Sequence, residues 1–186
     1  MNEIGLLRNQ LAAEWTHVRE VASACATAHA SARTPPAEGA LEAFSQACAR
    51  YLRRALGCFE QRERRLGELY ARLPAADPGR QALERLRSIG GAGEALAKLS
   101  AATADKGGAA AELRAREAWV ELARFANGPR NAWCGGLEAL LASNPRVKDW
   151  RTFAGIDADS VVEERSLYAR VRETLPAGIR LVAGPV

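Results

Sequence analysis

The residues of this 186-residue chain best suited to metal chemistry are two histidines, His17 and His29. A metal pair in a helical core needs several histidines and carboxylates that project from facing helices, often with a Glu-x-x-His spacing. Only one Glu-x-x-His occurs, Glu14-Trp15-Thr16-His17, where such a metal pair uses two, and the two histidines are twelve residues apart in one helical pattern, which places them on different faces. The sequence therefore predicts a protein without a bound metal or any other cofactor.

The four cysteines, Cys25, Cys48, Cys58 and Cys134, are far apart in the sequence and form no Cys-x-x-Cys pair. A zinc site needs cysteines or histidines clustered at short spacings, and the sequence contains no such cluster. Because no secretion signal is recognisable, a disulfide framework is not expected. We expect reduced thiols that act as small, partly buried hydrophobic residues.

Sequence motifs of catalysis are missing as well. The chain contains no Gly-x-Ser-x-Gly, no phosphate-binding loop and no dinucleotide fingerprint, and the run Gly90-Gly91-Ala92-Gly93 lies inside a helical pattern with no strand before it. General acid and base work would fall to carboxylates such as Glu14 or Glu63, and such residues are far more often exposed or ion-paired. The sequence favours a protein that is not an enzyme.

The elements that would position these residues are helices. Four stretches carry apolar residues at alternating spacings of three and four, and they cover residues 2–32, 36–73, 78–103 and 109–126. Prolines at 35 and 74 lie between the first three stretches, Asp105-Lys106-Gly107-Gly108 lies between the third and the fourth, and Pro129 follows the fourth. The glycines near residue 90 leave two alternatives for the third helix, a close helix crossing or a real break.

Two further helical patterns follow in the C-terminal part. One covers residues 129–142, and the other begins at Ser160-x-x-Glu163, which has the spacing of a capping box, and ends before Pro176. We therefore predict an all-α fold, an antiparallel four-helix-bundle-like domain with additional short C-terminal helices. The main bundle is expected within residues 2–127 and the short helices and tail within 129–186 of a single domain.

Four aromatic residues on the stripes of the first two helices are expected in the core: Trp15, Phe44, Tyr51 and Phe59. The stripe of the second helix is interrupted at Arg62 and Glu63. This interruption has two interpretations: the helix leaves the bundle there, or a buried polar group has found a partner.

Composition supports a helical protein in water. The chain contains 39 alanines, the best helix former, and only 13 Val and Ile residues, too few for a sheet-rich fold. No apolar run is long enough to span a membrane, and we expect a soluble, cytoplasmic protein that does not bind membranes.

The formal charge is +4, and most of the excess lies in the second helix, where residues 39–76 contain seven arginines and four glutamates. The arginines are Arg50, Arg53, Arg54, Arg62, Arg64, Arg65 and Arg72. Because glutamates are interleaved with them and no base-reading motif accompanies them, we expect no strong binding to nucleic acid.

One short stretch of the second helix resembles a known metal-binding family. The residues Cys58-Phe59-Glu60-Gln61-Arg62-Glu63 are similar to the His-Phe-x-x-Glu-Glu stretch of hemerythrin-like proteins, with cysteine in the histidine position, and His17 could match that family's first ligand. Since the family's other histidines have no counterpart, this resemblance implies a metal-less hemerythrin-like bundle.

A second resemblance covers residues 12–75 and points to the Rsd/AlgQ family of bacterial anti-sigma regulators. Trp15-Thr16-His17-Val18-Arg19 is similar to a segment of that family's first helix. Ala40-Leu41-x-x-Phe44-x-Gln46, then Tyr51-Leu52, then Gly57-Cys58-Phe59 resemble its next signature, in the same order. The resemblance implies a helical protein that binds the promoter-reading region of the housekeeping sigma factor and regulates transcription.

The expected mode of action is therefore binding to another protein, with a sigma factor or RNA polymerase as the named candidate. A helical adaptor or chaperone for another bacterial protein is the alternative, and the oligomeric state is left open. The second helix is long enough that it either kinks near Gly57 or projects beyond its shorter neighbours. In the second case its basic end is a candidate surface, as is the first helix around His17. The candidate partner-binding residues are His17, Arg19, Arg62, Arg64, Arg65 and Arg72.

Overall fold

The computed structural model describes residues 3–31, 39–72, 74–77, 80–81, 84, 92–103, 109–128 and 158–183. Within these residues all regular secondary structure is helical, which confirms the predicted all-α fold. The helices are α1 (Glu3–Ala30), α2 (Ala40–Tyr70), α4 (Ala92–Thr103), α5 (Ala109–Asn127) and α8 (Ala158–Glu173). None of these helices has the length and apolar character needed to cross a membrane.

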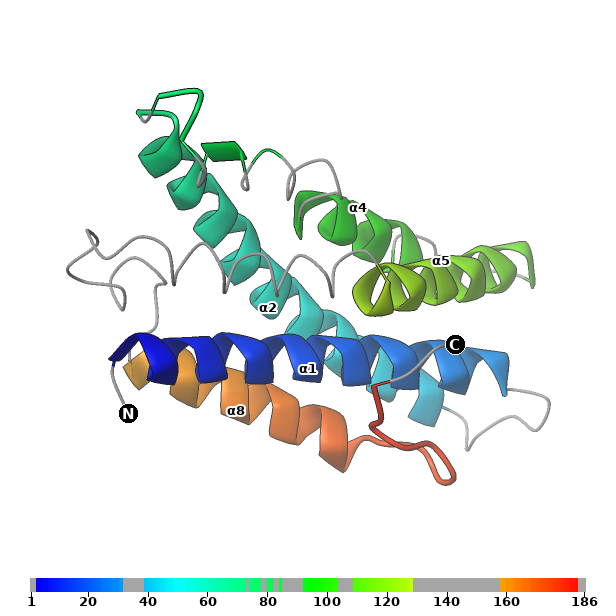
Figure 1. Ribbon diagram of the computed structural model, residues 1–186. Coiled ribbons are helices and arrows are strands. Elements are labelled where there is room, and N and C mark those ends of the chain that lie inside the picture. The colour runs from blue at the N-terminus through cyan, green and yellow to red at the C-terminus, as the bar shows by residue number, and fades with distance from the viewer. Residues whose placement is uncertain are drawn as a thin grey trace.

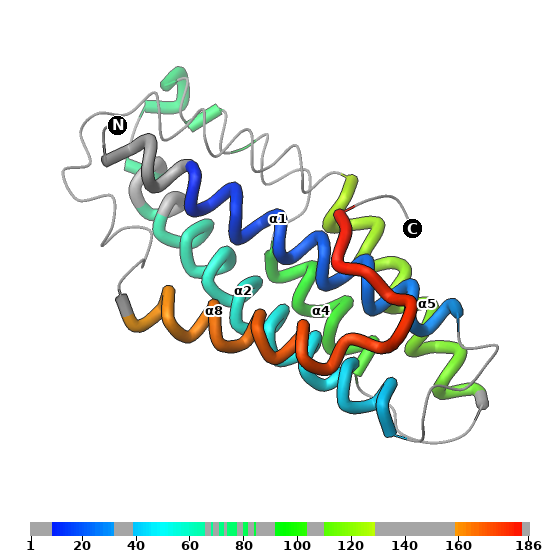
Figure 2. The backbone as a smooth tube through the Cα atoms, turned by 90° about the horizontal axis from the view of Figure 1, so that it is seen from below, coloured from blue at the N-terminus to red at the C-terminus, as the bar shows by residue number. Residues whose placement is uncertain are grey.

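Four of the helices form the predicted bundle. In it α1 packs against α2 and α5, and α4 packs against the same two helices, so that α1, α2, α4 and α5 form a ring (Figure 1). Neighbours in the ring run in opposite directions. The remaining helix, α8, lies outside the ring against α2, as Figure 2 also shows, and its side chains reach α1 at His17 and Glu20.

The core of the bundle is built from the apolar stripes that the periodicity predicts. Trp15, Phe44, Tyr51 and Phe59 are all buried, as expected, together with Trp119 on α5. Alanines and cysteines fill much of the remaining space, and such small side chains let helices pack closely.

The amino end of α4 is fixed by a residue from another helix. Both carboxylate oxygens of Glu63 accept a hydrogen bond from the backbone N–H of Ala92, at 3.0 and 3.1 Å. This contact satisfies one of the N–H groups that a helix start leaves unpaired, and it places a negative charge at the positive end of the helix dipole. Glu63 thus fits the second interpretation of the interrupted stripe of the second helix, in which a polar group has found a partner.

Only part of the glycine cluster lies within the described residues. Gly93 lies inside α4, and a Cβ atom added there would be 3.3 Å from Oε1 of Glu60 on α2. This position therefore fits the close-crossing interpretation. Gly90 and Gly91 lie outside the described residues, as does most of the predicted helix before Ala92.

In the C-terminal part, the expectation of a capping box at Ser160 is wrong. Because α8 begins at Ala158, Ser160 is already in its first turn. Beyond the helix, Gly178 adopts a positive φ of 83°, and the chain turns so that Ile179 and Leu181 pack on the core. The predicted helix over residues 129–142 lies outside the described residues.

Candidate functional site

Helix α8 is attached to the bundle by a network of three polar side chains from three helices. Nδ1 of His17 on α1 lies 2.9 Å from Oε1 of Glu164 on α8. The Tyr51 hydroxyl on α2 donates a hydrogen bond to the same oxygen, at 3.1 Å. One carboxylate therefore joins α1, α2 and α8.

A second tyrosine extends this network. The ring of Tyr168 on α8 stacks on the imidazole of His17, with centroids 4.1 Å apart and an interplanar angle of 16°. Its hydroxyl donates to Oε2 of Glu20 on α1, at 2.6 Å. His17 is thus held between a carboxylate and an aromatic ring, both of which come from α8.

The electrostatics of the network favour the charged forms of His17 and Glu164. The hydrogen bond to Glu164 raises the pKa of His17 above its ordinary value of 6.5, and burial opposes this only in part. The hydrogen bond from His17 holds the pKa of Glu164 below its ordinary value of 4.5. Burial raises the pKa of Tyr51, which keeps its hydroxyl protonated and able to donate.

These shifts predict a pH-dependent stability. Because folding raises the pKa of His17, the protonated form of His17 stabilises the fold. This stabilisation is complete below about pH 6.5 and is lost as the pH rises through the folded-state pKa. The lowered pKa of Glu164 acts in the opposite direction, because its stabilisation is present above pH 4.5 and is lost as the pH falls. The stabilisation of the fold by the His17–Glu164 pair is therefore greatest between about pH 4.5 and pH 6.5.

We expect the free energy of unfolding of the wild type to fall between pH 6 and pH 8.5 relative to that of Glu164→Gln. Because His17 is partly exposed and screened by solvent, the difference should be a few tenths to about 1 kcal/mol. Urea denaturation at four pH values measures it. Glu163→Gln is the matched control, since Glu163 pairs with Arg54 and no histidine is involved. Equal slopes in both variants would contradict this role of Glu164.

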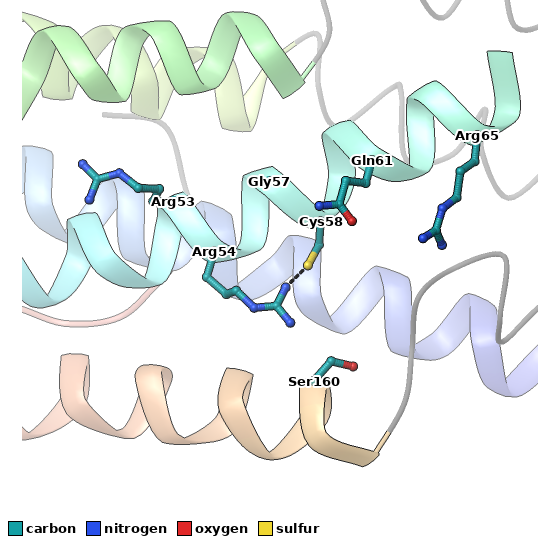
Figure 3. A pocket seen from close by; sticks show the side chains of 7 residues that line it. All are labelled: Arg53, Arg54, Gly57, Cys58, Gln61, Arg65 and Ser160. Atoms are coloured by element: carbon teal, nitrogen blue, oxygen red, sulfur yellow. Dashed lines mark hydrogen bonds between the residues drawn. The ribbon is translucent and has the colours of Figure 1, made fainter. Parts of the chain in front are cut away.

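A cavity of about 430 Å³ lies between α2 and the start of α8. It is lined by Arg53, Arg54, Gly57, Cys58, Gln61, Arg65 and Ser160. Figure 3 shows Arg54 and Arg65 on the side of α2 that faces Ser160, while Arg53 extends away from them. We call this cavity the basic cleft, because the described residues that line it include three arginines and no acid.

One arginine of the basic cleft is held in place from two sides. Nε of Arg54 donates to Oε2 of Glu163 on α8, at 2.6 Å, and its Nη1 contacts Sγ of Cys58 one turn along α2. Glu163 is about half exposed, so this ion pair adds little stability. Its effect is to fix the direction of the guanidinium group.

The expectation that Arg62 lies on an exposed surface is wrong. Only 4% of Arg62 is exposed, and its Nη1 donates to Oε2 of Glu14 on α1, at 2.7 Å. The guanidinium carbon lies 5.0 Å from the centre of the Phe59 ring. Arg62 is therefore a buried cation with a carboxylate partner and an aromatic neighbour, and no other protein can reach it in the folded state.

The remaining predicted partner-binding residues do not form one surface. Arg19 of α1 faces α5, where its Nε donates to Oδ1 of Asn127, at 3.0 Å. It therefore faces away from His17, which contacts α8. Arg64 and Arg72 are exposed near the carboxyl end of α2, and Arg65 lines the basic cleft.

The thiols occupy two kinds of site. Cys25 and Cys48 are buried, as expected, and free. Burial raises the pKa of Cys25, but hydrogen bonds from Cys48 and His29 outweigh it and bring the value to about 7. Cys58 is the third free thiol and lines the basic cleft, and Cys134 lies outside the described residues.

The residues that match the hemerythrin stretch do not come together. Cys58 lines the basic cleft, Glu63 binds the start of α4, and His17 binds α8. Within the described part of the chain, no group of three or more His, Cys, Asp or Glu side chains is arranged to hold a metal ion.

The class of protein that these observations define is an all-α bundle with a docked C-terminal helix and a basic cleft. No protein-family model matches the chain, and no curated protein or solved structure does either. The resemblance of residues 12–75 to the Rsd/AlgQ family therefore stays a prediction.

Two parts of the site were missed from the sequence. Glu164 and Tyr168 are one turn apart on the face of α8 that contacts His17, and this i,i+4 spacing of a carboxylate and an aromatic residue was the available signal. Arg54 and Arg65 were counted as part of a basic helix, but their common face with Cys58 was not recognised.

Proposed function

We propose that this protein acts by binding another protein and that it is an Rsd-like anti-sigma regulator of transcription. The observation that carries the proposal is the basic end of α2, where Arg64 and Arg72 are exposed and form no ion pair with any described residue. Figure 1 shows this end rising past the start of α4. Exposed arginines are frequent at protein interfaces because the guanidinium group binds carboxylates with two hydrogen bonds.

Helix length explains why this end is uncovered by its neighbour. Helix α2 has 31 residues, whereas α4, which packs on the same side, has 12. At 1.5 Å per residue, α2 is longer by roughly 28 Å. The resemblance of residues 12–75 to the Rsd/AlgQ family supports the choice of a sigma factor as partner.

A helical adaptor or chaperone is the second candidate, and the charge of α2 favours it. A basic surface associates faster with an acidic one, whereas a DNA-reading surface is basic. The two candidates differ in the partner expected from a lysate: sigma factor or RNA polymerase in the first case, a client protein or a secretion component with an acidic surface in the second.

We expect the double variant Arg64→Glu with Arg72→Glu to lose partner binding by about 30-fold or more, since reversal of exposed charges at an interface turns attraction into repulsion. Its free energy of unfolding should stay within about 0.5 kcal/mol of the wild type. Titration of the purified housekeeping sigma factor, followed by fluorescence, measures the binding.

The matched control reverses two exposed arginines elsewhere, Arg116→Glu on α5 with Arg180→Glu in the tail. This variant has the same net charge and should bind as the wild type does. If the wild type does not bind the sigma factor, the anti-sigma assignment is wrong. If both double variants bind equally well, the partner surface is not at the end of α2.

A further inference from the structure

Two buried thiols from different helices contact each other near one end of the bundle. Cys25 lies in the last two turns of α1 and Cys48 near the start of α2, and Figure 1 shows that these helix ends lie at the same end of the bundle. Sγ of Cys25 is 4.0 Å from Oγ of Ser45 on α2. Because Ser45 and Cys48 are three residues apart, they share the face of α2 that Cys25 contacts. The two thiols are hydrogen-bonded to each other, and both are free.

A histidine lies beside the two thiols, in a tautomer that its contacts define. The Ser45 hydroxyl donates to the backbone carbonyl of Leu41, at 2.8 Å, since a carbonyl can only accept. Nε2 of His29, 2.9 Å from the Ser45 oxygen, therefore carries a proton and donates to that oxygen. Nδ1 is left as the nitrogen that can accept a proton, and the imidazole is hydrogen-bonded to Cys25. The ring of Trp119 on α5 stacks on this imidazole, with centroids 6.2 Å apart.

The surroundings of the two thiols give them different roles. Burial raises the pKa of Cys25, but its hydrogen bonds to Cys48 and His29 outweigh burial and bring the pKa to about 7. A thiol whose pKa is near the ambient pH combines a large thiolate fraction with good nucleophilicity. Burial and the hydrogen bond to Cys25 raise the pKa of Cys48, which therefore stays protonated. Cys25 is the nucleophile of the pair, and Cys48 is the thiol that can react with its product.

Burial restricts the reagents that can reach the thiols. Cys25 and Cys48 are 0% exposed, whereas His29 and Ser45 beside them are partly exposed. His29 lies in the last turn of α1, and helix ends open locally at a lower free-energy cost than helix centres do. Such an opening admits a small neutral molecule but not a large disulfide such as oxidised glutathione. Among two-electron oxidants, the site therefore favours a small hydroperoxide.

We propose that Cys25 and Cys48 form a site of reversible oxidation by a small hydroperoxide, which ends in a disulfide between α1 and α2. This site does not depend on the proposed partner protein. In the first step Nδ1 of His29 takes the proton of Cys25, and the sulfur attacks the terminal oxygen of the hydroperoxide. The O–O bond breaks, Cys25 becomes a sulfenic acid, and the leaving oxygen takes the proton from His29 and departs as an alcohol, or as water from hydrogen peroxide.

The second step closes the disulfide. The Cys48 sulfur attacks the sulfenic sulfur of Cys25, so that an S–S bond forms and the S–O bond breaks. The hydroxide that leaves takes the Cys48 proton and becomes water. In total the two sulfurs lose two electrons, which the hydroperoxide gains. An external dithiol such as dithiothreitol reverses the reaction by thiol–disulfide exchange.

Tryptic digestion of the full-length protein detects this disulfide, because cleavage after arginines 19, 33 and 50 places Cys25 and Cys48 in separate peptides, 20–33 and 34–50. The reduced protein is treated with hydrogen peroxide under native conditions, alkylated with N-ethylmaleimide and digested without reductant. Mass spectrometry should find the two peptides linked, with the loss of two hydrogen atoms, in most of the protein. Dithiothreitol should separate them again.

Alanine variants test the order of the two steps. In Cys48→Ala the second step is impossible, so the sulfenic acid at Cys25 should accumulate, and its labelling by dimedone should rise about fivefold or more over the wild type. In Cys25→Ala, dimedone labelling of Cys48 should stay about fivefold or more below that level. Alanine already fills much of this core, so both variants are expected to fold, which circular dichroism checks. Equal labelling of the two folded variants would contradict the assigned roles.

His29→Gln tests the base. Glutamine can still donate to Ser45 but takes no proton, so the disulfide should form about tenfold more slowly. A variant that only loosened the packing would expose the thiols and react faster, which distinguishes a lost base from a lost contact. Gln46→Ala, at an exposed position beside Ser45, is the control and should change the rate by less than about twofold. The proposal is overturned if the native protein forms no linked peptides, if linkage requires urea, or if His29→Gln reacts as fast as Gln46→Ala.

Discussion

Replacement of Arg62 by methionine is expected to lower the free energy of unfolding by about 3–5 kcal/mol, the usual cost of leaving one member of a buried ion pair without its partner. The Arg62 side chain is 5% exposed and that of Glu14 is 12% exposed. Without the guanidinium group, the Glu14 carboxylate keeps only its hydrogen bond from Gln10. Chemical denaturation at neutral pH measures the loss.

Two further variants show whether the loss has this origin. In the double variant Glu14→Leu with Arg62→Met no charge is left buried, so a large part of the lost stability should return. Arg54→Met removes an ion pair with a half-exposed acid and should cost less than about 1 kcal/mol. If Arg62→Met lowers the free energy of unfolding no more than Arg54→Met does, the buried Arg62–Glu14 pair is not needed for the stability of the fold.

The helices of the bundle were largely predictable because their information is local. The stripe of residues 109–126 predicted α5 to within one residue at its end, and the aromatic stripe of α2 predicted which side chains are buried. Both follow from the 3.6-residue period, which a single segment of sequence contains. The capping motif at Ser160 failed for a related reason: a spacing of three also occurs inside a helix, as it does in α8.

The polar contacts were not predictable, because each partner lies far away in the sequence. Arg62 and Glu14 are 48 residues apart, and His17 and Glu164 are 147 apart. Arg62 interrupts an apolar stripe, and this interruption is equally consistent with a helix that leaves the bundle and with a buried ion pair. Only the packing of α1 against α2 decides between these interpretations.

For the basic cleft, the helical period predicts which residues share a face of α2 but not what lies opposite that face. Arg54, Cys58, Gln61 and Arg65 follow one another at spacings of four, three and four, which places them on one face of α2. The sequence thus contains the face, but it does not show that the start of α8 covers it. A row of arginines on an uncovered helix face is a solvated surface, whereas the same row opposite Ser160 lines a cavity.

Truncation of Phe59 to alanine is expected to lower the free energy of unfolding by about 3–5 kcal/mol, because its fully buried ring makes two contacts where α1 packs on α2. It meets Trp15 edge to face, with centroids 5.1 Å apart at 83°, and it lies beneath the guanidinium group of Arg62. Phe59→Leu keeps most of the volume and should cost roughly 1–2 kcal/mol. Because the Phe59 ring also helps to hold Arg62, the losses from Phe59→Leu and Arg62→Met should not be additive in a double-mutant cycle. Additive losses, measured by denaturation of all three variants, would mean that the ring stabilises the core without supporting the buried arginine.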